Sequence, residues 1–143
     1  MRPSNAIVQS DRFPQQWGEG DSEPPPGRDF TQALLRGLVQ HDPGLILYSA
    51  TVAEKHWEHS NWYFWVKWRS EEYRIAVAAI PESNGQWLVA VTRVNIGLFK
   101  AVFGGSREVD DRFLEILQNI IRGVAGTNEV KWVDDKEVSN LLG

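Results

Sequence analysis

The sequence predicts an α+β fold, a two-layer sandwich in which an antiparallel sheet packs against two helices. Hydrophobic residues recur at helical spacing near both ends of the chain, which indicates amphipathic helices. Between residues 45 and 94 they follow a period of two, which is typical of strands. Hairpin signals join these strands, so we expect a four-strand meander with a short fifth strand, in the order α-β-β-β-β-α-β.

Residues 1–28 are expected to form a disordered or loosely docked tail ahead of a single domain at residues 29–143. The tail holds five of the seven prolines and few apolar side chains that could offset the entropy of ordering it. The proline triplet at 24–26 favours a short polyproline stretch, which could also be a ligand for a proline-reading domain. Phe13 and Trp17 could pack against the domain and hold the tail on its surface.

The first helix is expected to begin at Asp29, whose carboxylate is a good N-cap, with Gln32 completing a capping box. Its apolar residues recur at helical spacing as far as Leu38. The tetrapeptide His-Asp-Pro-Gly at 41–44 should end it, because proline cannot continue a helix and glycine permits the turn.

The central region should form the meander. Ser70-Glu71 is expected to be a tight turn, and the loop at 81–85 ends in Asn-Gly, the dipeptide that most readily supplies positive φ angles. The four strands are expected at residues 45–53, 61–69, 72–80 and 86–94.

The last third of the chain is expected to be mainly helical. Residues 95–103 favour a short helix, and residues 106–124 a long amphipathic helix with Ser106 as its N-cap. Gly126 is placed to end that helix in a left-handed conformation. Residues 129–133 should form the last strand, followed by a frayed end.

The two turns determine which side chains share a face of the sheet. In this register Trp68 pairs with Tyr73 and Ala79 with Ala90, so one face is almost wholly apolar and should receive the helices. The second face is mixed, with aromatic rings beside cations and alanines that would form a shallow trough. The residues expected to bind a partner on this second face are Tyr63, Trp65, Lys67, Arg74, Trp87 and Arg93.

Rigid aromatic rings beside cations are typical of binding hot spots, which favours a protein partner for this face. Lys67 and Arg74 would be cross-strand neighbours of like charge, an unfavourable pair unless an anion or an acid compensates it. The alternative is that the tail or a second subunit covers the face as ordinary core.

Residues 56–59 read His-Trp-Glu-His and are the weak metal candidate, through His56 and His59. Their spacing matches no strong metal motif, so a solvated loop is favoured and no metal or cofactor is expected. No Gly-x-Ser-x-Gly elbow or other recognisable nucleophile setting is present. A small-ligand or metal-dependent enzyme that uses this loop is therefore an alternative and not the first hypothesis.

Composition narrows the function classes further. The chain has 143 residues with 15 basic and 19 acidic side chains, and this net charge of -4 argues against nucleic acid as a partner. The absence of cysteine excludes a disulfide scaffold, a thiolate zinc site and an iron–sulfur cluster. No apolar run approaches the length of a membrane span, so we expect a soluble cytoplasmic protein that does not contact membranes.

In size, acidity and mixture of elements the chain resembles small secretion chaperones and toxin-neutralising immunity proteins. This resemblance covers architecture only. It implies a small non-enzymatic module that binds another protein. A homodimer, or a larger structural homo-oligomer whose second sheet face pairs with itself, is the remaining alternative.

Overall fold

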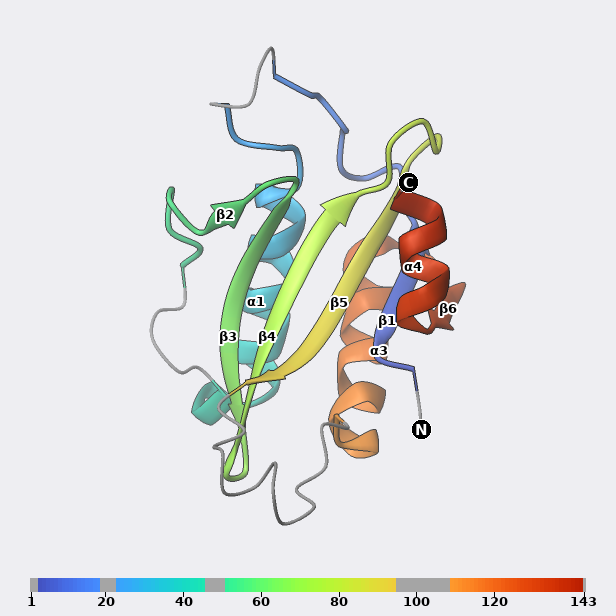
Figure 1. The fold of residues 1–143 in the computed structure, drawn as a ribbon. Helices are drawn as coiled ribbons and strands as arrows, with labels where there is room; N and C mark the ends of the chain where they lie inside the picture. Colours follow the sequence, from blue (N-terminus) through green and yellow to red (C-terminus); the bar gives the residue numbers. More distant parts are fainter. Residues whose placement is uncertain (1–2, 19–22, 46–50, 95–108, 143) are drawn as a thin grey trace.

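The computed structural model describes residues 3–18, 23–45, 51–94 and 109–142. In chain order the elements are β1 (Asn5–Gln9), α1 (Arg28–His41), a 3-10 turn (Pro43–Leu45), β2 (Trp57–Glu58), β3 (Asn61–Trp68), β4 (Glu71–Ala79), β5 (Gln86–Val94), α3 (Asp111–Ala125), β6 (Val130–Val133) and α4 (Asp135–Leu142). The strands form one antiparallel sheet in the order β2-β3-β4-β5-β1-β6. The predicted α+β class and antiparallel meander are therefore confirmed (Figure 1).

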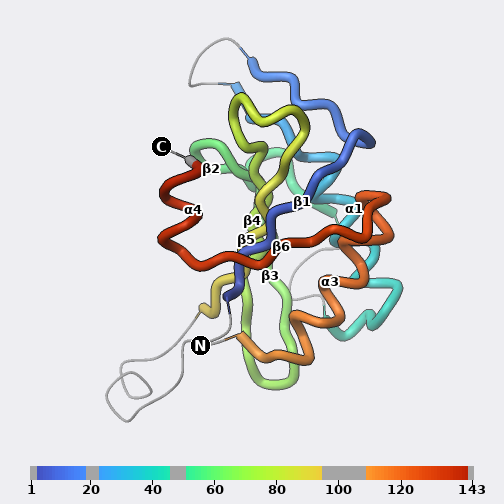
Figure 2. The backbone as a smooth tube through the Cα atoms, turned by 90° about the vertical axis from the view of Figure 1, so that its right-hand side faces the viewer, coloured from blue at the N-terminus to red at the C-terminus, as the bar shows by residue number. Residues whose placement is uncertain are grey.

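The helices lie on both faces of this sheet. Figure 2 shows α1 and α3 on one side and α4 on the other. We call the side of α1 and α3 the inner face and the side of α4 the outer face. Gly37 of α1 meets Ile120 of α3 so closely that a Cβ at position 37 would lie 2.6 Å from the Ile120 Cγ2 atom. A larger residue at position 37 would therefore require the Ile120 side chain to move.

Strand β1 corrects the prediction of a loose tail. Asn5–Gln9 lies inside the sheet, antiparallel to both β5 and β6. Ala6 and Val8 are fully buried among the core side chains. The Asn5 side-chain amide donates a 2.8 Å hydrogen bond to the Asp135 carboxylate. The folded domain therefore includes residues ahead of the boundary that we expected at residue 29.

Several further elements differ from the expected ones, and one lies outside the described residues. The strand predicted at 45–53 is not observed: Leu45 ends the 3-10 turn, residues 46–50 lie outside the described residues, and residues 51–53 form no strand. The helix predicted at 95–103 lies outside the described residues. The long helix predicted from Ser106 begins at Asp111 with Asp110 as its N-cap. Where a frayed end was expected, the chain forms helix α4.

The first helix begins differently from the prediction. Gly27 occupies the N-cap position, so Asp29 lies in the first turn and does not cap the helix. Instead of closing a capping box, the Gln32 side-chain oxygen accepts a 2.7 Å hydrogen bond from the Val52 backbone N–H. The end of α1 at His41 is as predicted. This helix is positioned by tertiary contacts rather than by a local side-chain cap.

The ends of α3 show ordinary capping chemistry. The Asp110 carboxylate accepts a 3.1 Å hydrogen bond from the Phe113 backbone N–H, which satisfies one of the donors exposed at a helix start. Gly126 has a φ of 73° and ends the helix in the left-handed conformation, as predicted.

The β3–β4 hairpin turns at Arg69-Ser70, one residue earlier than expected. Val66 therefore pairs with Tyr73, whereas Trp68 was expected to do so. A shift of two residues keeps each side chain on its predicted face, because side chains alternate with a period of two. The predicted faces of β3 and β4 are thus correct.

The predicted register of β5 is wrong, and each of its side chains lies on the face opposite to the predicted one. Ala79 pairs with Trp87 and not with Ala90, a shift of three residues. The connecting loop is wider than a two-residue Asn-Gly turn, and the Gln86 N–H donates a 3.2 Å hydrogen bond to the Ser83 hydroxyl oxygen inside it. Because three is odd, every side chain of β5 exchanges faces.

Candidate functional site

An aromatic cluster lies on the outer face, and we define it by His56, Glu58, Tyr63, Trp65 and Arg74. The Tyr63 and Trp65 rings meet edge to face with centroids 5.1 Å apart. The His56 ring lies 5.7 Å from Tyr63 and 5.5 Å from Trp65. The Arg74 guanidinium carbon lies 4.3 Å above the Tyr63 ring, and its Nη2 atom is 3.3 Å from Glu58 Oε2.

The local sequence explains how this cluster forms. Alternation along β3 turns Tyr63 and Trp65 to the outer face, while their neighbours face the helices. A two-residue turn, in which His59 has a φ of 56°, folds the preceding segment back along β3. The Tyr63 backbone N–H donates a 3.0 Å hydrogen bond to the His56 carbonyl, which fixes the histidine beside the two rings.

The structure places four of the six predicted partner-binding residues on the outer face, namely Tyr63, Trp65, Lys67 and Arg74. Lys67 pairs across the strands with Glu72, and Arg74 pairs with Trp65. The like-charge pair of Lys67 and Arg74 is therefore a wrong prediction, because the turn lies one residue earlier than assumed.

Trp87 and Arg93 do not lie on the predicted partner-binding surface, which corrects the prediction. Trp87 is fully buried on the inner face, and Arg93 lies on that face too, paired with Glu71. The reversed faces of β5 account for both errors. Trp65 and Arg93 consequently lie on opposite sides of the sheet and cannot share a partner contact.

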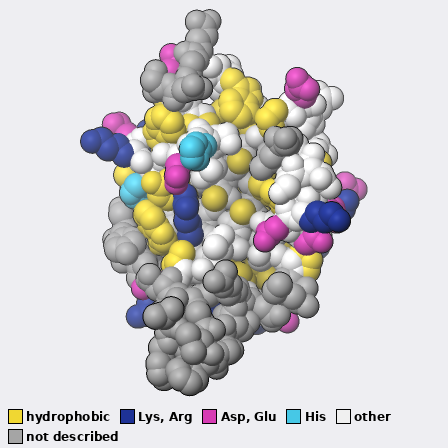
Figure 3. Space-filling view, in the orientation of Figure 1, with side chains coloured by type: hydrophobic (Ala, Val, Ile, Leu, Met, Phe, Trp, Pro, Cys, Tyr) yellow, Lys and Arg dark blue, Asp and Glu magenta, His cyan; other side chains and the backbone are white. Residues whose placement is uncertain are grey.

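The middle of the outer face is lined by small side chains. Tyr63, Ala76 and Ala90 stand in one row across β3, β4 and β5. Beyond this row α4 covers the sheet, where Val138 packs with Ile7 against a small buried cluster. Figure 3 shows hydrophobic side chains beside cationic, acidic and histidine side chains on this face.

The two histidines of the predicted loop lie in different environments. His56 belongs to the aromatic cluster, a role that spacing alone did not indicate. The His59 side chain is 86% exposed and lies 3.7 Å from Glu58. Among the residues that the structure describes, no group of three or more His, Asp or Glu side chains could hold a metal ion.

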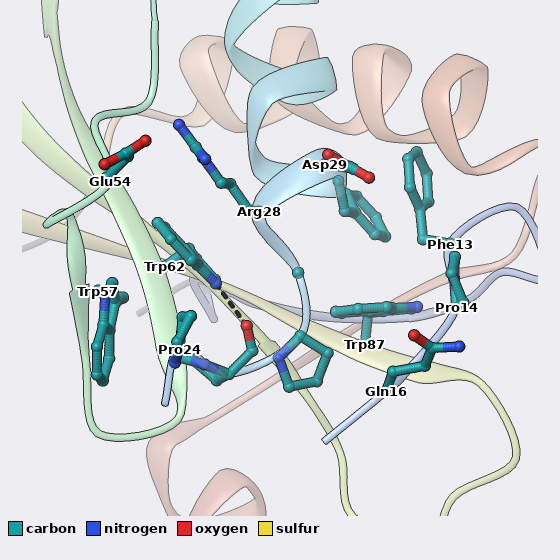
Figure 4. Close-up of a pocket in the computed structure, with 14 residues that line it drawn as sticks. Phe13, Pro14, Gln16, Pro24, Arg28, Asp29, Glu54, Trp57, Trp62 and Trp87 are labelled. Carbon is teal, nitrogen blue, oxygen red and sulfur yellow. Dashed lines mark hydrogen bonds between the residues drawn. The ribbon is translucent and has the colours of Figure 1, made fainter. Parts of the chain in front are cut away.

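The sequence analysis missed a pocket on the inner side of the molecule. This tryptophan pocket has a volume of about 530 Å³ and lies where the proline triplet meets the ends of β3 and β5 (Figure 4). The Trp62 indole N–H donates a 2.8 Å hydrogen bond to the Pro25 carbonyl. The triplet is thus packed against its own domain. The lining residues are Phe13, Pro14, Gln16, Pro24, Pro25, Pro26, Gly27, Arg28, Asp29, Phe30, Glu54, Trp57, Trp62 and Trp87.

Comparison with known protein families, curated proteins and solved structures found no match to this chain. None of the helices in the described ranges combines the length and apolar character that a bilayer span requires. Function is therefore inferred from side-chain geometry.

Proposed function

We propose that this chain is a small, non-enzymatic protein-binding module that contacts its partner through the aromatic cluster. The supporting observation is that Tyr63, Trp65, His56 and Arg74 already contact one another on a part of the sheet that α4 leaves uncovered. Rings held in place before binding lose less conformational entropy when a partner arrives. Tyrosine, tryptophan and arginine are also the residue types that dominate binding energy at interfaces.

The charges of the cluster indicate the chemistry of the partner. The Arg74–Glu58 ion pair is solvent-exposed, with 32% and 56% of the side chains accessible, so it contributes little stability. The Arg74 Nε atom has no hydrogen-bond partner among the described residues. A carboxylate of the partner can take the place of Glu58 on this guanidinium.

The small side chains indicate what lies beside that carboxylate. Ala76 and Ala90 stand in the same row as Tyr63 and have small apolar side chains, so we infer that an apolar side chain of the partner packs against them. The proposed partner is therefore a protein segment in which an apolar residue stands next to Asp or Glu. The acidic, cysteine-free composition supports a cytoplasmic location for this interaction.

Capture from a lysate of the native host, compared between matched variants, tests the proposal. The test variant is Trp65→Ala with Arg74→Gln. The control variant is Trp17→Ala with Arg112→Gln, which removes the same residue types from exposed positions outside the cluster, where Trp17 is 47% exposed and the Arg112 side chain 63%. A photo-crosslinker at Thr92, exposed in the row of Arg74, identifies the captured chain and its contact segment.

We expect the wild type and the control to crosslink one acidic, apolar segment of another protein, and the folded test variant to lose it. If all three proteins recover the same amount of partner, the aromatic cluster is not the binding surface. A crosslinked product of twice the mass of this chain would instead establish the homo-oligomer alternative.

A further inference from the structure

One side chain that lines the tryptophan pocket carries a hydrogen-bond donor without a partner among the described residues. Trp87 is fully buried, and its Nε1 atom has no acceptor among the described residues. In the same pocket the Nε1 atom of Trp62 is paired with Pro25. Buried N–H groups are almost always paired in native proteins, so this unpaired N–H beside a pocket favours an acceptor supplied by a ligand once a neighbouring side chain moves aside.

The walls of the pocket are suited to a flat apolar molecule. Phe13 stacks on Phe30 with ring centroids 4.6 Å apart, and Phe30 lies 5.2 Å from Trp87, which holds the indole plane fixed. Trp57 and Trp62 stand on the opposite side with centroids 6.4 Å apart. A volume of about 530 Å³ is within the usual range for small-molecule sites.

The charges around the pocket argue against an anionic ligand. Its lining includes one cation, Arg28, and two carboxylates, Asp29 and Glu54, which sum to -1. The Arg28 guanidinium is already engaged, since it donates to the Val52 carbonyl at 3.2 Å and lies 5.7 Å from the centre of the Trp62 ring. An uncharged ligand is therefore favoured.

We propose that the tryptophan pocket binds an uncharged, planar, largely apolar small molecule whose hydrogen-bond acceptor pairs with Trp87 Nε1. In Figure 4 the nitrogen-bearing edge of Trp87 is turned toward the segment that carries Pro14 and Gln16. Gln16 is exposed, so its side chain can move aside at low cost and let the acceptor reach the indole nitrogen. The pocket shares no residue with the aromatic cluster, so the two proposals stand or fall separately.

Two ligands and two variants test this proposal. The probes are 9-fluorenone, a neutral planar molecule with one carbonyl acceptor, and fluorene, which has the same rings without the carbonyl. Trp87→Phe removes the unpaired donor from the pocket. Trp68→Phe is the matched control, because Trp68 Nε1 is also buried without a partner among the described residues but lies outside the pocket. Binding is followed by the indole N–H resonances and by quenching of tryptophan fluorescence.

In the wild type and in Trp68→Phe we expect 9-fluorenone to bind about five- to tenfold more tightly than fluorene, the effect of one hydrogen bond. The Trp87 indole N–H resonance should move downfield on binding. In Trp87→Phe the two probes should bind equally. Equal affinities of the two probes for the wild type, a shifted Trp68 resonance with an unmoved Trp87 resonance, or no binding of 9-fluorenone at its solubility limit would each overturn the proposal.

Discussion

The Trp62 indole nitrogen donates a 2.8 Å hydrogen bond to the carbonyl oxygen of Pro25, 37 positions earlier in the chain. Both residues are buried, so this bond holds the proline triplet against the first residues of β3. We predict that Trp62→Phe lowers the free energy of unfolding by about 1 to 3 kcal/mol more than Trp68→Phe does. Both variants lose one indole, but only the first leaves a buried carbonyl without its donor.

Urea denaturation followed by circular dichroism measures this difference. A Trp62→Phe variant as stable as Trp68→Phe would mean that the hydrogen bond to Pro25 contributes nothing to stability.

The packing of β1 gives a second prediction. Val8 is fully buried between the sheet and the inner helices, so Val8→Ala should cost about 2 to 3 kcal/mol through lost burial and the cavity left behind. Gln9→Ala, at the exposed next position of the same strand, should change stability by no more than about 0.5 kcal/mol. Thermal unfolding of the two variants compares them. Equal and small losses of stability in the two variants would show that β1 packs only loosely against the domain.

Gly123 within α3 and Gly126 at its C-cap should respond in opposite directions to the same substitution. Gly123 has open space around the position of a Cβ, so Gly123→Ala should stabilise the helix by about 0.5 to 1 kcal/mol. Gly126 has a φ of 73°, and a Cβ there would lie 2.5 Å from the Arg12 guanidinium. Gly126→Ala should therefore destabilise by about 1 to 2 kcal/mol. Chemical denaturation of both variants checks the signs, and a stabilising Gly126→Ala would contradict the left-handed end of α3.

The stability of the protein should fall at high pH because of Tyr73. Burial raises the pKa of the Tyr73 hydroxyl, and the nearby Asp110 and Glu71 carboxylates raise it further, although the hydrogen bond from the Asp110 N–H acts in the opposite direction. In the unfolded chain a tyrosine ionises near pH 10. The contribution of Tyr73 is therefore complete below about pH 10 and is lost as the pH rises through the higher pKa of the folded state.

Denaturation midpoints at about pH 9 and about pH 11 measure this loss. The wild type should lose more stability between the two than Tyr73→Phe, which has no proton to release. The comparison uses the pH dependence of each protein, because the substitution also removes the hydrogen bond to Asp110 at every pH. Parallel pH profiles of the wild type and Tyr73→Phe would show that ionisation of Tyr73 does not cause the loss of stability.

The sequence predicted the fold class because the signals for it are local. The alternation along β3 and β4 and the turn between them lie within a short stretch of chain. The turn lies one residue earlier than predicted, and the resulting register shift of two residues left the faces unchanged. The loop before β5 was harder to predict. Glu82 and Asn84 both adopt positive φ, and nothing in the identity of Glu82 indicates this. The resulting odd shift reversed β5 and moved Trp87 and Arg93 off the predicted surface.

The features that were missed depend on contacts between distant parts of the chain. β1 is five residues long, and its two partners lie far along the sequence, so a local pattern could not outweigh the surrounding prolines. His56 reaches the aromatic cluster only because the turn at His59 folds it back. The tryptophan pocket combines the tail with the ends of β2, β3 and β5, which no periodicity brings together.

The position of β1 has a consequence for how the chain folds during synthesis. Strand β1 is synthesised before both of its neighbours in the sheet, β5 and β6, and the Asn5 side chain bonds to a residue 130 positions later. Its two edges therefore stay unpaired until β5 and β6 have emerged from the ribosome. Such long-range pairing slows folding and leaves strand edges exposed in the meantime. Nascent chains of this protein should accordingly need protection from aggregation until β6 has been synthesised.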